Sequence, residues 1–65
     1  MPKQSYSSRE IIKLLEDGGF ILDQVKGSHH IYYHPVDKKR AVVPHPKKEL
    51  PYGTARSILK QAGFL

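Results

Sequence analysis

The stretch VKGSHHIYYHP, from Val25 to Pro35, places a glycine–serine pair directly before a run of histidines and tyrosines. Gly27-Ser28 is typical of a tight turn, because glycine allows a positive φ and serine can hydrogen-bond the local backbone. The run HHIYYH, residues 29–34, is rich in aromatic side chains, which suit the pleated surface of a strand. The stretch therefore predicts a turn followed by a strand that carries three of the chain's four histidines.

The residues on either side extend this strand into a sheet. FILDQVK, residues 20–26, has the apolar content of a strand and leads into the turn. Residues 35–39 contain proline, aspartate and lysine, as a hairpin loop does. RAVV, residues 40–43, predicts a third strand, which Pro44 ends. Three consecutive strands joined by short polar turns predict an antiparallel meander.

A helix with a complete N-terminal signal precedes the strands. Ser7 and Glu10 have the S-x-x-E spacing of a capping box, in which each side chain satisfies an otherwise unpaired backbone N–H. Tyr6 lies where a hydrophobic staple would pack against the first apolar position of the helix. Gly18-Gly19 predicts the end of the helix. The apolar stripe consists of Ile11, Ile12, Leu14 and Leu15.

A second helix follows the strands. Pro51 suits its first turn, where a missing N–H costs nothing, and Gly63 predicts its end. Its apolar positions recur at i, i+3, i+4 and i+7. They are Ala55, Ile58, Leu59 and Ala62. The sequence thus predicts one α+β domain over residues 1–65, in the order α-β-β-β-α, with both helices on one face of a three-stranded antiparallel sheet.

Composition narrows the class of protein. With 38% hydrophobic and 26% charged residues, the 65-residue chain has the composition of a small globular domain. It has no cysteine, which excludes disulfides and thiolate zinc sites and fits a reducing cytoplasm. Its apolar runs are too short for a membrane helix or a signal peptide. We therefore expect a cytoplasmic location and no membrane partner.

The charge balance indicates the kind of partner. Eleven Lys+Arg against six Asp+Glu give a net charge of +5. In so small a domain this excess favours a polyanion, most often a nucleic acid. An acidic protein partner would also suit this charge.

Strand parity gives an expectation for the histidines. Side chains in a strand alternate between the two faces of a sheet. Because Ile31 is the most apolar residue of the run, we expect its face, with Tyr33, to pack on the helices. The predicted inner face has His29, Ile31 and Tyr33, and the predicted open face has His30, Tyr32 and His34.

An imidazole on an open sheet face can take or give a proton near neutral pH. Cleaving RNA requires a base to activate the ribose 2′-hydroxyl and an acid to protonate the leaving oxygen, and histidine can serve either step. A metal site is disfavoured because His30 and His34 would lie more than about 10 Å apart on an extended strand. An ordinary polar strand face remains an alternative interpretation.

Several basic and turn residues are candidate phosphate contacts. Lys26, Gly27 and Ser28 surround the turn beside His30. Lys47 and Lys48 precede the second helix, whose N-terminus offers free N–H groups and a partial positive charge. His45, between two prolines, is either a ligand contact or a structural hydrogen-bonding group.

Two segments together resemble a known family. GSHHIYYHP, residues 27–35, and VPHPKKELPYGTARSILKQAG, residues 43–63, are similar to the HicA (YcfA-type) mRNA interferases, the toxin half of type II toxin–antitoxin pairs. The motifs G-S-x-H, V-P-x-H and R-x-I-L-K-Q-x-G occur here in that order. The resemblance implies a fold like that of double-stranded-RNA-binding domains, endoribonuclease activity on mRNA, and a HicB-type antitoxin that covers the active site.

The resemblance also implies a site. The catalytic residue would be the histidine that closes G-S-x-H, here His30, with His29 as the weaker candidate. The second proton-transfer group stays open among His29, His45 and Tyr32. No cofactor or metal is expected. The RNA contacts that we predict from the residues themselves are Lys26, Gly27, Ser28, Tyr32, Lys47 and Lys48. The alternative function is a non-catalytic RNA-binding module of the same fold, which would bind RNA and leave it intact.

Overall fold

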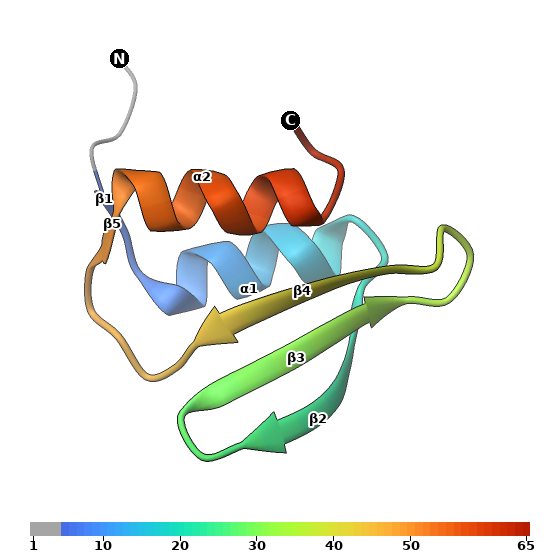
Figure 1. Cartoon of the computed structure of the whole chain (residues 1–65), viewed down its shortest axis with the longest axis horizontal. Helices are drawn as coiled ribbons and strands as arrows, with labels where there is room; N and C mark the ends of the chain where they lie inside the picture. Colours follow the sequence, from blue (N-terminus) through green and yellow to red (C-terminus); the bar gives the residue numbers. More distant parts are fainter. Residues whose placement is uncertain (1–4) are drawn as a thin grey trace.

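The computed structural model of the chain describes residues 5–65. Its elements run in the order β-α-β-β-β-β-α, in which the first and fifth strands are very short (Figure 1). They are β1 (Ser5–Tyr6), α1 (Ser8–Asp17), β2 (Ile21–Lys26), β3 (His29–His34), β4 (Lys39–Pro44), β5 (Leu50–Pro51) and α2 (Tyr52–Gln61). The two helices and the three long strands confirm the predicted α-β-β-β-α order.

The three long strands form an antiparallel sheet in the order β2-β3-β4, which confirms the meander. The register between β2 and β3 shifts at Asp23, where one extra residue bulges out of β2. Strands β1 and β5 pair with each other in a separate two-stranded sheet. The sequence did not predict this pair, because two-residue strands show no periodicity.

The core lies between the two helices and one face of the β2-β3-β4 sheet, and β4 runs closest to both helices while β2 lies farthest from them (Figure 1). All six residues of β2 are exposed. The helices therefore leave the β2 side of this sheet face uncovered. The buried core residues are Ile11, Leu15, Phe20, Tyr32, Ala41, Val43, Leu50, Ala55, Ile58 and Ala62.

The parity assignment of β3 was wrong. Tyr32 is only 4% exposed, and it pairs across the sheet with the fully buried Ala41. The face that carries His30, Tyr32 and His34 is therefore the one that packs toward the helices. A tyrosine ring buries more apolar surface than isoleucine does, and the small side chain of Ala41 leaves room for it. Ile31 lies on the outer face instead, paired with Val42.

Tyr33, which we expected in the core, also lies on this outer face. The Arg40 guanidinium carbon lies 4.9 Å from the centre of the Tyr33 ring. A carboxylate oxygen of Asp23 pairs with the same guanidinium at 2.9 Å. A tyrosine under a paired arginine is well accommodated at a solvated sheet surface, which explains why it need not enter the core.

The helix boundaries follow the local signals. The Ser7 Oγ accepts a hydrogen bond from the Glu10 N–H at 3.1 Å, and the Glu10 carboxylate accepts one from the Ser7 N–H at 2.9 Å. This confirms the capping box. Gly19, with φ of 97°, provides the left-handed residue after α1. Pro51 is the N-cap of α2 and lies one residue before the first turn that we predicted for it.

Candidate active site

A groove lies between α1 and the uncovered β2 side of the sheet. Its volume is about 350 Å³. It exists because the helices pack over β4 and leave the inner side of β2 and part of β3 accessible. Its lining residues are Arg9, Ile12, Lys13, Glu16, Leu22, His30, Tyr32 and His45.

His30 lies in this groove and not on the open face of the sheet. It is half-buried, and the centre of its ring lies 4.6 Å from the centre of the His45 ring, with 64° between the two planes. His29 is exposed on the outer face. It lines a separate cavity together with Pro44 of β4 and Thr54 in the first turn of α2. The two histidines of the G-S-x-H motif therefore lie on opposite sides of the sheet, and only His30 has a second imidazole beside it.

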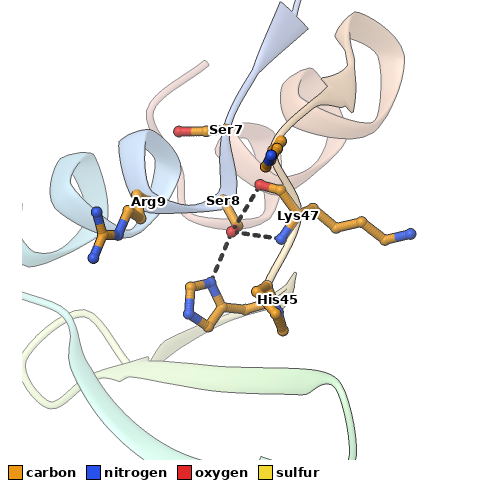
Figure 2. A pocket seen from close by; sticks show the side chains of 7 residues that line it. Ser7, Ser8, Arg9, His45 and Lys47 are labelled. Carbon is orange, nitrogen blue, oxygen red and sulfur yellow. Dashed lines mark hydrogen bonds between the residues drawn. The ribbon is translucent and has the colours of Figure 1, made fainter.

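His45 is held in place from two sides. Its backbone N–H donates to the Ser28 carbonyl at 2.7 Å, which attaches it to the Gly27-Ser28 turn. Its Nδ1 lies 2.7 Å from the Ser8 Oγ at the start of α1 (Figure 2). The two interpretations of His45, structural and ligand-contacting, are therefore compatible, because its ring is hydrogen-bonded at Nδ1 while it borders the groove.

Ser8 fixes the whole loop that carries His45. It is 1% exposed. Its N–H donates to the Lys47 carbonyl at 3.0 Å, and its Oγ lies 3.1 Å from both the carbonyl oxygen and the amide nitrogen of Lys47. We expected Lys47 and Lys48 at the N-terminus of α2, but these bonds place Lys47 against the N-terminus of α1.

A second cavity, of about 300 Å³, adjoins the groove at this loop. It shares Arg9 and His45 with the groove, so these two side chains border both. The Arg9 and His45 side chains lie on one side of the Ser8 hydroxyl, and the Lys47 side chain extends away on the other (Figure 2). The cavity is lined by Ser7, Ser8, Arg9, His45, Pro46, Lys47 and Lys48.

Arg9 and Lys13 are site residues that the sequence analysis missed. Both are exposed on α1 and line the groove beside His30. Their i, i+4 spacing, which puts two cations on one helix face, is the signal that could have revealed them. Of the predicted RNA contacts, Lys26 is exposed at the end of β2. Gly27 adopts a φ of 57°, as the predicted turn requires.

Tyr32 does not offer the exposed RNA contact that we expected, because its ring is packed in the core. Burial, and then the nearby Glu16 carboxylate, raise the pKa of Tyr32 above its usual value of 10.0. At neutral pH the phenol is therefore a protonated group at the floor of the groove, and it does not supply a base.

His34, the remaining histidine of β3, has a structural position. Its Nδ1 accepts hydrogen bonds from the N–H groups of Val36 at 3.2 Å and Asp37 at 3.0 Å, which close the β3–β4 turn. Its ring packs edge-on against Phe20, with 5.1 Å between ring centres.

Across residues 5–65, no group of three His, Cys, Asp or Glu side chains is arranged to hold a metal ion. Over the same residues, neither helix is long and apolar enough to cross a membrane.

The fold and the groove define a small basic α+β domain with paired imidazoles beside exposed cations. The chain matches the family model described as the HicA toxin of bacterial toxin–antitoxin over residues 8–64. The match covers nearly the whole chain, so this protein belongs to the HicA toxin family and is the toxin of a toxin–antitoxin pair. No curated protein matches the sequence.

The raised pKa of Tyr32 predicts a loss of stability in alkali. Above about pH 10 the unfolded chain ionises this tyrosine while the folded protein keeps it protonated, so the folded state binds more protons and its stability falls as pH rises. We expect the free energy of unfolding, measured with urea at about pH 9 and about pH 11, to fall less in Tyr32→Phe than in the wild type. Tyr52→Phe, at a 45% exposed position, is the matched control, and its free energy of unfolding should fall as much as that of the wild type. An equal fall of this free energy in the wild type and in Tyr32→Phe would contradict a raised pKa of Tyr32.

Proposed function

We propose that this toxin is a metal-independent endoribonuclease that cleaves mRNA, with His30 as a proton-transfer group of its active site. The observation that supports this most strongly is the groove itself. It brings the half-buried His30 together with a second imidazole, His45, and with the cations Arg9 and Lys13. Membership of the HicA toxin family supports ribonuclease activity independently.

The side chains of the groove suit the chemistry of RNA cleavage. A phosphodiester in the groove would place its negative charge between Arg9 and Lys13 on one side and the imidazoles on the other. A guanidinium binds phosphate oxygens with two parallel hydrogen bonds and so orients the phosphate as well as attracting it. An imidazole beside that phosphate can remove the proton of the ribose 2′-hydroxyl or protonate the leaving 5′-oxygen.

The flanking RNA would follow the basic residues that border the groove and the adjoining cavity. Lys47 and Lys48 line the adjoining cavity at the N-terminus of α1, and we propose that they contact the phosphates on that side. Lys26, Gly27 and Ser28 form the turn before His30, and we propose contacts to the next phosphate there. These contacts are made to phosphates and not to bases, so we expect the toxin to bind RNA of many sequences.

A toxin of this family acts with an antitoxin partner. We propose that the partner is a HicB-type protein and that it inhibits the toxin by covering the groove, where its acidic side chains would meet Arg9 and Lys13. Because mRNA is the proposed substrate, we also propose that the toxin acts in the cytoplasm.

The direct test is cleavage of a long single-stranded mRNA by the purified toxin. We expect the wild type to cut this RNA equally well with and without EDTA. His30→Ala should lose about a hundredfold or more of the cleavage rate, which is the usual loss when a general acid or base is removed. Because His30 is half-buried, we expect the variant to lose about 1 kcal/mol of stability and to remain folded. Circular dichroism and urea unfolding would verify this, and His30→Asn provides a second, more conservative variant.

His29→Ala decides between the two histidines of the motif. Since His29 lies on the outer face, we expect a smaller loss than for His30→Ala. Loss of cleavage in the His29 variant alone would place the chemistry on the other face and contradict the proposed site. If the folded wild type binds RNA and leaves it intact, the protein is an RNA-binding module, and the ribonuclease proposal is wrong.

RNA binding through the groove predicts a particular salt dependence. Each phosphate contact of a single strand contributes about −0.7 to the slope of log K against log salt. We expect Arg9→Ala to weaken binding of a non-cleavable 2′-O-methyl RNA and to make this slope shallower by about 0.7. Lys38→Ala, in the distant β3–β4 turn, is the matched loss of one charge and should keep the wild-type slope. Identical slopes for the Arg9→Ala and wild-type proteins would contradict a phosphate contact at Arg9.

A further inference from the structure

We propose that His45 is the second catalytic residue of this site and acts as the general base, while His30 acts as the general acid. Ser8 is a positioning residue that holds the His45 ring. This inference rests on the proposed ribonuclease function and assigns the half of the proton transfer that a single histidine leaves unassigned.

His30 and His45 lie close together in space. His30 comes from β3 and His45 from the loop after β4, yet their ring centres lie 4.6 Å apart in the same groove. A 2′-oxygen and the 5′-oxygen that leaves the same phosphorus are both within a few ångströms of that atom, so an acid and a base must lie close together. The other two histidines cannot form such a pair. His29 is on the outer face, and the Nδ1 of His34 is occupied by two backbone N–H groups.

The hydrogen bonds of Ser8 indicate which nitrogen of the His45 ring carries the proton. The Ser8 Oγ has one proton to donate and two lone pairs to accept with. It accepts from the Lys47 N–H, and it lies within hydrogen-bonding distance of the Lys47 carbonyl and of the His45 Nδ1. Because a carbonyl can only accept, all three contacts are satisfied together when the Ser8 hydroxyl donates to the carbonyl and the His45 Nδ1–H donates to Ser8.

This arrangement leaves the Nε2 of neutral His45 without a proton, on the part of the ring that Ser8 does not hold. An imidazole with a bare nitrogen is a base. His45 is also fixed through its backbone bond to Ser28, so the bare nitrogen is positioned before RNA arrives. The bond to Ser8 further stabilises the ring when Nε2 gains a proton, because Nδ1 is already a donor.

The reaction then balances with the two imidazoles alone. The 2′-oxygen forms a bond to phosphorus while the bond from phosphorus to the 5′-oxygen breaks. The proton of the 2′-hydroxyl goes to the Nε2 of His45, and the proton of the His30 imidazolium goes to the departing 5′-oxygen. The products are a 2′,3′-cyclic phosphate and a 5′-hydroxyl, and water returns the two histidines to their starting protonation states.

The decisive experiment separates the acid from the base. Two RNAs are compared, one natural and one with sulfur in place of the 5′-oxygen at a mapped cleavage site. A thiolate leaves without being protonated, so this substitution removes the need for the acid and keeps the need for the base. We expect the cleavage rate of His30→Ala to be about a hundredfold below that of the wild type on the natural RNA, and to recover most of that loss on the sulfur RNA. The cleavage rate of His45→Ala should be about a hundredfold below that of the wild type on both RNAs.

Two further measurements guard against a purely structural effect. His45→Gln is compared with His45→Ala, because glutamine keeps a polar group near Ser8 and cannot transfer a proton. Affinity for 2′-O-methyl RNA should remain within a few-fold of the wild type in both variants, which would show that the loss of cleavage activity is a loss of kcat and not of RNA binding. In addition, long-range ¹H–¹⁵N NMR of the wild type should show neutral His45 protonated at Nδ1, and Ser8→Ala should shift that ring toward the Nε2–H form.

The outcomes are distinguishable. If wild type cleaves and His30→Ala does not, the proposed function stands, whatever His45 does. A folded His45→Ala that cleaves natural RNA within a few-fold of wild type overturns the inference. Recovery of His45→Ala on the sulfur RNA, or an Nε2–H tautomer in the wild type, overturns its assignment as the base. If the wild type cleaves neither RNA, the proposed function fails and this inference fails with it.

Discussion

The hydrogen bonds of the Ser8 hydroxyl group hold the site together. It is buried at the first residue of α1, and it hydrogen-bonds both the His45 ring and the backbone of Lys47. Through it, the start of the first helix fixes the loop that follows the last long strand. Without the bond from Ser8, the His45 ring would keep only the backbone attachment of His45 to Ser28, and the cavity that Lys47 lines would lose a contact between its loop and α1.

The groove itself is a consequence of how two short helices cover a three-stranded sheet. Both helices pack over β4, whose Ala41 and Val43 are fully buried, while β2 remains exposed along its length. Tyr32 is buried in the core and lines the groove together with His30. A small basic domain thereby gains a concave surface, which His45 from the loop after β4 completes.

Much of the fold could be predicted from local signals in the sequence. The capping box at Ser7, the glycine turn before β3 and the apolar stripes of the helices all depend on residues close in sequence. The structure confirms them except at Leu14, which we placed in the stripe of the first helix and which is 41% exposed. The face assignment of β3 was wrong because it considered only the hydrophobicity of Ile31. Tyr32 instead fits opposite the small Ala41, and its side chain is larger than that of isoleucine. The contact of Ser8 with His45 joins residues 37 positions apart, so no local pattern could reveal it.

We have proposed that RNA chemistry takes place on the helix-facing side of the sheet, between His30 and His45. NMR of the histidine and tyrosine side chains would show which face binds RNA, as a 2′-O-methyl RNA, which binds but cannot be cleaved, is added to the toxin. We expect the ring resonances of His30 and His45 to shift together as the RNA saturates the protein, and those of His29 to change less. Shifts confined to His29 and Tyr33 would place the RNA on the outer face and contradict this proposal.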